Sequence, residues 1–134
     1  MIESALANNI RFRVIIACSL GCPYEGVVDA DKVCSLMHQL SADYTSKEVA
    51  DVCFADTIGV ATAGSCYTLL DAILNKNDYG FEICVHFHDT YGQALSNILT
   101  SLSFGVRMLE SSVGGLGGCP FAKGATGNVA TENV

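Results

Sequence analysis

The sequence has few charged residues, and basic residues are the scarcer kind. Lys and Arg number seven against fourteen Asp and Glu, so 16% of the 134 residues are charged and the formal net charge is −7. An acidic chain is repelled by the phosphate backbone of nucleic acids. We therefore expect no nucleic-acid partner.

Long apolar runs are also lacking. No stretch approaches the roughly 20 apolar residues that a membrane-spanning helix needs, so we expect no membrane association. The segment from Met1 to Asn9 has neither the basic start nor the apolar middle of a secretory signal peptide. No targeting signal is visible, and the sequence by itself leaves the compartment open.

The seven cysteines do not form a recognisable disulfide or zinc framework. They are odd in number and lie apart, mostly in apolar segments, which favours free thiols in a reducing compartment. Cys18 and Cys22 have three residues between them, but no second pair at a matching spacing follows them. Small buried hydrophobes are the commoner role for such cysteines.

Half of the residues are apolar, and their pattern alternates between strand and helix. The nearly continuous apolar run Arg11–Leu20 predicts a strand buried on both faces. After it, Asp29 and Asp31 are candidate N-caps for a helix. The apolar stripe expected of that helix comprises Val33, Leu36, Met37 and Leu40.

The same unit then repeats along the chain. We expect strands at 48–54, 81–87 and 107–113, with a helix at about 64–74 between the first two. The next helix should bury the stripe formed by Leu95, Ile98, Leu99 and Leu102. Residues 131–134 resemble the first turn of a further helix.

Four strands separated by helices predict an α/β fold with a parallel sheet and right-handed crossovers. Four such units make half of a (β/α)8 barrel, whose usual length is about 250 residues. The pattern alone equally permits a four-stranded open sheet. In both folds a ligand would bind at the carboxyl ends of the strands.

His86 and His88 stand at the end of the third predicted strand with one residue between them. Side chains alternate along a strand, so both imidazoles should point to the same face and could share one metal ion. An isolated His-x-His pair is more often structural. Two inward imidazoles in an acidic protein would, however, be costly to bury without partners, and a divalent cation satisfies both.

A glycine-rich segment, Ser111–Phe121, begins in the last residues of the fourth predicted strand. Four glycines in five positions allow its backbone to approach a ligand closely and to move, and Cys119 and Pro120 come directly after them. A flexible linker is the alternative, but linkers rarely carry a cysteine and a proline in this position. We therefore expect a functional lid with Cys119 on it.

Two further polar residues are candidates with plain structural alternatives. Asn128, in the turn Gly124–Asn128, could offer a hard oxygen ligand to a metal, although Asn after Gly is commonly an ordinary turn residue. Asp56, at the end of the second predicted strand, could bind substrate or water. It could instead cap the turn that follows it.

Five segments carry a family resemblance: LGCPYEG at 20–26, DTIG at 56–59, HFHDTYGQAL at 86–95, VGGLGGCPF at 113–121 and GATGN at 124–128. Together they make the sequence resemble the 3-hydroxy-3-methylglutaryl-CoA (HMG-CoA) lyase family. The glycine-rich cysteine segment is the signature of that family, whereas His-x-His-Asp is shared with the wider superfamily of metal-dependent acyl-CoA lyases and synthases.

The resemblance implies a partial TIM barrel, with residues 1–134 as the C-terminal half of a pyruvate carboxyltransferase-like lyase domain that is incomplete at both ends. It implies cleavage of HMG-CoA to acetyl-CoA and acetoacetate with Mg²⁺ or Mn²⁺. His86, His88 and Asn128 match the family's metal ligands, and Cys119 matches its active-site cysteine. A homodimer is expected, in the mitochondrial matrix of a eukaryote or the cytoplasm of a bacterium.

Some family residues have no match in this chain. The family's metal-binding Asp, its catalytic Arg and a further acidic residue belong to early barrel strands, so we expect the isolated chain to be inactive. One alternative is a non-catalytic remnant that serves as an interaction or metal-binding module. Another is a related synthase that condenses acetyl-CoA with a 2-oxo acid, although such enzymes lack the Gly-Gly-Cys-Pro loop.

Overall fold

A computed structural model describes residues 1–122 and 127–134 of the chain. Its strands are β1 (Phe12–Ile16), β2 (Val49–Asp56), β3 (Ile83–Phe87) and β4 (Met108–Glu110). Its α-helices are α1 (Ile2–Ala7), α2 (Ala30–Asp43), α3 (Ala63–Leu70) and α4 (Ala94–Ser103). A π-helical turn, Asp71–Asn75, continues α3, and short 3-10 turns occupy Val113–Gly115 and Thr131–Asn133.

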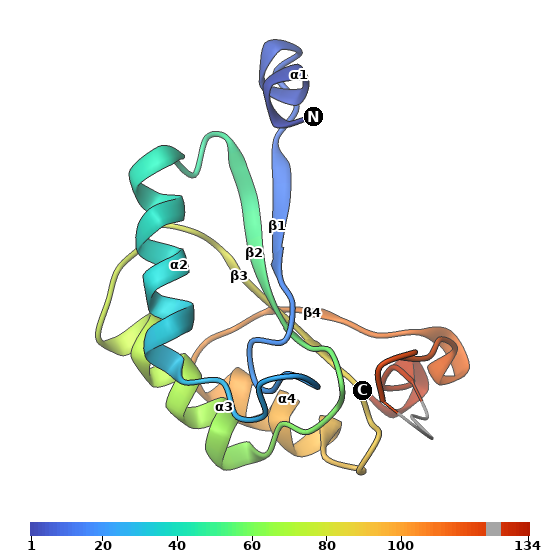
Figure 1. The fold of residues 1–134 in the computed structure, drawn as a ribbon. Coiled ribbons are helices and arrows are strands. Elements are labelled where there is room, and N and C mark those ends of the chain that lie inside the picture. The colour runs from blue at the N-terminus through green and yellow to red at the C-terminus, as the bar shows by residue number, and fades with distance from the viewer. Residues whose placement is uncertain (123–126) are drawn as a thin grey trace.

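The four strands form one sheet in the order β1-β2-β3-β4, and every neighbouring pair is parallel. Helices α2, α3 and α4 connect successive strands and lie together on one side of this sheet (Figure 1). The predicted α/β fold with four parallel strands is therefore confirmed. The carboxyl ends of all four strands lie at the same edge.

Polar residues fix where the helices begin. The carboxylate of Asp29 accepts a hydrogen bond from the backbone N–H of Asp31 and caps α2, as the sequence predicted. At α3, Thr62 and Ser65 form a capping box in which each side chain accepts from the other residue's backbone N–H. These caps set the positions of the two helices relative to the strands before them.

Alternation along β2 and β3 separates a helix-facing core from the opposite face of the sheet. Val52 and Phe54 of β2, with Val85 and Phe87 of β3, are buried in the core against the helices. The residues between them, such as Cys53, point to the opposite face. That face carries the candidate chemistry, because His86 belongs to it.

Three burial predictions were wrong. On α2, Leu36 belongs to the predicted apolar stripe but is 49% exposed. The first strand is not buried on both faces, since β1 is an edge of this sheet and Ile15 is 58% exposed. On α4, Ile98 is 6% exposed as expected, but Leu99 is 69% exposed. The buried face of α4 consists of Ala94, Asn97, Ile98 and Ser101.

The polar members of that buried face are held by hydrogen bonds. Asn97 donates through Nδ2 to the carbonyl oxygen of Ala61, and the hydroxyl of Ser101 donates to the carbonyl oxygen of Asn97. Hydropathy alone could not identify this buried face. Its small residues let α4 pack closer to α3 than leucines would, and its polar residues can be buried because they are hydrogen-bonded.

Among the helices of the described residues, none has both the length and the apolar character that a membrane span requires.

Candidate active site at the carboxyl ends of the strands

His86 and His88 lie side by side at the carboxyl end of β3. Their ring centroids are 5.1 Å apart and the rings meet edge to face at 61°. Phe87 between them is buried in the core on the other side of the sheet. Strand alternation therefore brings the two imidazoles together, as the sequence analysis expected.

Glu110 of β4 orients the first imidazole. It is paired with His86 in the parallel register, and its Oε2 lies 2.9 Å from His86 Nδ1. This contact occupies Nδ1, and no other hydrogen bond of the His86 ring is seen within the described part of the chain. Nε2 is thus the nitrogen that remains for a ligand, oriented by a carboxylate as metal-binding histidines commonly are.

The segment that starts at Gly127 returns across the ends of β3 and β4. The backbone N–H of Asp89 donates to the carbonyl oxygen of Gly127 at 2.9 Å, and that of Ser112 donates to Val129 at 3.0 Å. An antiparallel bridge pairs His88 with Asn128. These contacts place Asn128 next to the histidine pair.

Two buried polar atoms in this group lack a hydrogen-bond partner among the described residues: His88 Nδ1 and Asn128 Oδ1. Asn128 Nδ2 donates to the carbonyl oxygen of Leu116 at 2.9 Å, which fixes the orientation of the amide. Buried polar atoms without partners are costly, and a cation is one ligand that satisfies both. Imidazole nitrogens with an amide oxygen form a donor set that suits a divalent metal.

The protonation of His88 also favours a ligand role. Burial lowers the pKa of His88, and the neighbouring His86 lowers it further. A depressed pKa keeps the imidazole neutral at physiological pH, and the neutral ring is the form that coordinates a metal.

Glycines allow the loop after β4 to close around Asn128. A Cβ atom on Gly117 would lie 2.5 Å from Asn128 Nδ2, and one on Gly127 would lie 2.2 Å from the carbonyl oxygen of Gly117. Both glycines also have positive φ angles, which L-residues with side chains rarely adopt. The glycine-rich segment is therefore fitted to the site, and a simple linker does not explain this packing.

Cys119 is partly exposed on the same loop. Two residues further on, the ring of Phe121 meets that of Tyr24 edge to face, with centroids 6.3 Å apart. The loop thus rests on the segment that follows β1. Gly124, Ala125 and Thr126 of the predicted turn lie outside the described residues.

Asp56 does not point toward the histidines. Its side chain is fully buried on the helix side, where Oδ1 accepts from the backbone N–H of Val60 and Oδ2 from that of Ala61. Burial raises the pKa of Asp56 to about 6, although these N–H groups oppose the shift. The geometry supports the capping alternative over the predicted contact with substrate.

The sequence did not predict the parts that Glu110 and Glu132 play at this site. Glu110 was hidden inside a predicted strand, and only the register of β4 against β3 shows that it meets His86. Both carboxylate oxygens of Glu132 lie 2.9 Å from the backbone nitrogen of Gly114 and hold the start of the glycine-rich loop. The one available signal for Glu110 was an acidic residue in the middle of the predicted strand at 107–113.

A parallel βα sheet with two histidines and an asparagine at its carboxyl edge is characteristic of metal-dependent barrel enzymes, and the fold is part of a (β/α)8 barrel. The chain belongs to the HMGL-like family, which matches it over residues 1–134. It is similar to the cytoplasmic 3-hydroxy-3-methylglutaryl-CoA lyase of Rattus norvegicus, with 46% identity over all 134 residues and 38% of the rat protein.

Solved lyase structures share the fold as well as the sequence. Hydroxymethylglutaryl-CoA lyase from Pseudomonas aeruginosa has a TM-score of 0.86 and 46% identity, over 98% of this chain and 42% of that one. The HMG-CoA lyase from Brucella melitensis has a TM-score of 0.86 and 41% identity, and the match covers 99% of this chain and 45% of that one. The chain therefore spans less than half the length of these relatives. The matches are lyases, so the alternatives of a synthase or an interaction module are not better supported than a lyase.

Proposed function

We propose that this chain is part of a carbon–carbon lyase that cleaves HMG-CoA to acetyl-CoA and acetoacetate. One observation carries the proposal: His88 Nδ1 and Asn128 Oδ1 are buried without partners beside the ring of His86. Lyase relatives that match the entire chain supply the choice of substrate.

Three residues would hold the metal: His86 through Nε2, His88 through Nδ1 and Asn128 through Oδ1. We propose Mg²⁺ or Mn²⁺, because an amide oxygen with imidazoles and remaining positions for substrate oxygens suits these ions. A bound divalent cation would polarise oxygen atoms of the substrate as a Lewis acid.

The residues of the chain have separate roles around that ion. Glu110 accepts from His86 Nδ1 and so keeps the ring oriented. Cleavage requires the tertiary hydroxyl of HMG-CoA to lose its proton to a base. The carbon–carbon bond then breaks to give the keto group of acetoacetate and a thioester enolate, whose carbon must receive a proton. We assign that proton transfer to the thiol of Cys119, carried on a lid that closes over the site.

We also propose an assembly and a compartment for the intact protein. We propose a homodimer of the full-length protein. The relatives include rat lyases named cytoplasmic and mitochondrial and a bacterial enzyme. We propose the mitochondrial matrix if the source is a eukaryote and the cytoplasm if it is a bacterium.

The test is a product assay on the intact protein that contains this chain. Purified protein is freed of metal with EDTA, supplied with Mg²⁺ or Mn²⁺, and given HMG-CoA. We expect acetyl-CoA and acetoacetate in equal amounts, and only after metal is added. Products without added metal, or no products with either ion, would refute the proposal.

A further inference from the structure

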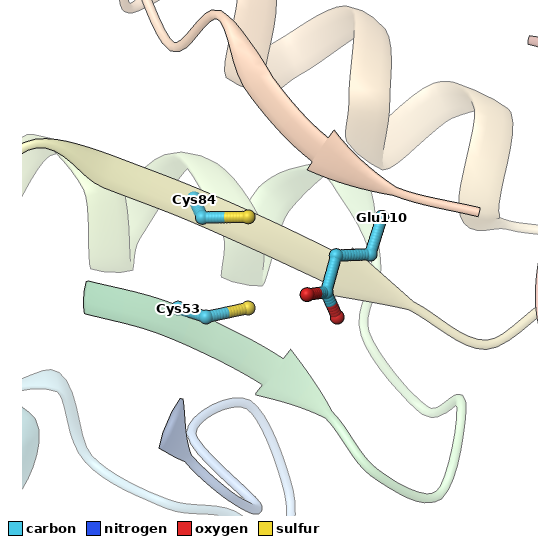
Figure 2. A group of neighbouring side chains, drawn as sticks. All are labelled: Cys53, Cys84 and Glu110. Carbon is cyan, nitrogen blue, oxygen red and sulfur yellow. The ribbon is translucent and has the colours of Figure 1, made fainter. Parts of the chain in front are cut away.

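A second cluster of potential ligands lies on the same face of the sheet, toward the amino-terminal side of His86. Cys53 of β2 and Cys84 of β3 are register partners on adjacent parallel strands. Figure 2 shows both sulfur atoms on one side of the sheet, with the carboxylate of Glu110 turned toward them. Both thiols are almost fully buried, whereas Glu110 is partly exposed.

The spacing of this cluster suits a small thiophilic cation. The two sulfur atoms and a carboxylate oxygen of Glu110 all lie within 4.8 Å of one another. Zinc binds thiolate sulfur at about 2.3 Å and carboxylate oxygen at about 2.0–2.2 Å, so ligands of one ion are separated by less than ~4.6 Å. Small side-chain movements would bring all three atoms into a shared coordination sphere.

The surrounding charges also favour a cation. Asp51 and Glu110 place two carboxylates around the thiols, and both of them pair with Arg13. The Nε atom of Arg13 lies 2.6 Å from Asp51 Oδ1. One guanidinium faces two carboxylates, so acidic side chains outnumber basic ones beside the two thiols.

Glu110 is already engaged, and this sets a condition on binding. Its Oε1 pairs with Arg13 and its Oε2 with His86 Nδ1. An ion must displace one of these contacts to reach the carboxylate. Arg13 is the more replaceable partner, because it keeps its ion pair with Asp51.

We propose that Cys53, Cys84 and Glu110 form a binding site for a soft divalent cation, zinc by preference, separate from the histidine–asparagine site. Three protein ligands leave a fourth position for water, as in many zinc centres. Two sulfur ligands select zinc over Mg²⁺ or Mn²⁺. This inference does not rest on the lyase reaction, because it concerns different ligands and a different class of ion.

Zinc K-edge X-ray absorption on the full chain tests the proposal. The reduced protein is loaded with one equivalent of Zn²⁺ and its fold is checked by circular dichroism. We expect two sulfur scatterers at about 2.3 Å, which the histidine–asparagine site cannot supply. Cobalt substituted for zinc should likewise give a sulfur-to-metal charge-transfer band.

Variants locate the sulfur ligands. Cys84→Ser should remove a sulfur scatterer and weaken zinc binding at least about tenfold. The matched control replaces the other close thiol pair, Cys18→Ser with Cys22→Ser, and should keep both scatterers. If Cys84→Ser fails to fold, the sulfur count of this control still decides whether the loop thiols or the strand thiols bind.

Three results would overturn the proposal. Zinc bound to the reduced protein only through nitrogen and oxygen would assign it to the histidines. Loss of the sulfur scatterers in the Cys18/Cys22 variant would move the site to the loop. A Cys53–Cys84 disulfide in protein purified without added oxidant, seen as an intact mass lighter by two hydrogens, would give the pair a redox role.

Discussion

Asp56 shows how burial of a single carboxyl group makes the stability of the fold depend on pH. Its pKa in the folded protein is raised to about 6 by burial, above the ordinary value of 3.8. A raised pKa means that protonation stabilises the fold. The contribution of Asp56 to stability is therefore fully present below pH 3.8 and is lost as the pH rises through about 6.

This predicts a pH-dependent effect of Asp56→Asn. The substitution removes one acceptor for the N–H groups of Val60 and Ala61, but it cannot ionise. The loss in free energy of unfolding caused by Asp56→Asn should therefore be smaller at pH 7 than at pH 4, by up to roughly 3 kcal/mol. Urea unfolding at both pH values measures it, and an equal cost at the two would contradict the assigned pKa.

Cys119 is the residue for which chemistry and packing make different predictions. In the intact protein, Cys119→Ala should lower kcat by about 10²–10⁴-fold, the usual contribution of a positioned acid or base. The melting temperature and metal affinity should stay close to wild type, because the side chain is partly exposed. Cys22→Ala, another partly exposed loop thiol, is the control; an equal fall in kcat would remove the special role of Cys119.

At the scale of elements, α4 is the helix in which the hydropathy pattern and the observed burial of side chains disagree. Ile98→Ala should destabilise the fold by about 2–5 kcal/mol, because that side chain is buried against the core. Leu99→Ala should change stability by less than about 0.5 kcal/mol, because Leu99 is exposed. Chemical denaturation of both variants tests this, and equal losses would show that the leucine face is covered.

The sequence predicted the order of helices and strands better than it predicted which of their faces are buried or in contact. Strand alternation was enough to bring His86 and His88 together, because it depends only on spacing within one strand. The contact of Glu110 with His86 depends on the register of β4 against β3, which is a property of two strands. The exposed face of β1 likewise depends on its place at the edge of the sheet.

At the scale of the whole molecule, the open sheet has consequences for turnover. The described residues place His86, His88 and Asn128 at one edge, and β1 and β4 end the sheet on either side. The family's early-strand Asp and Arg have no match in this sequence. The 134-residue chain alone should therefore turn over HMG-CoA at least roughly a thousandfold more slowly than a full-length relative, measured as acetoacetate release; comparable rates would contradict this.

The proposed lyase function depends most directly on the site formed by His86, His88 and Asn128, and Mn²⁺ titration followed by electron paramagnetic resonance tests metal binding there. His86→Ala and His88→Ala should each weaken Mn²⁺ binding by at least about tenfold, because each removes a ligand. His38→Ala is the matched control, because His38 lies on α2, where its ring packs against Tyr79. We predict unchanged binding in that control, whereas equal Mn²⁺ affinity in all three variants would contradict the proposed metal site.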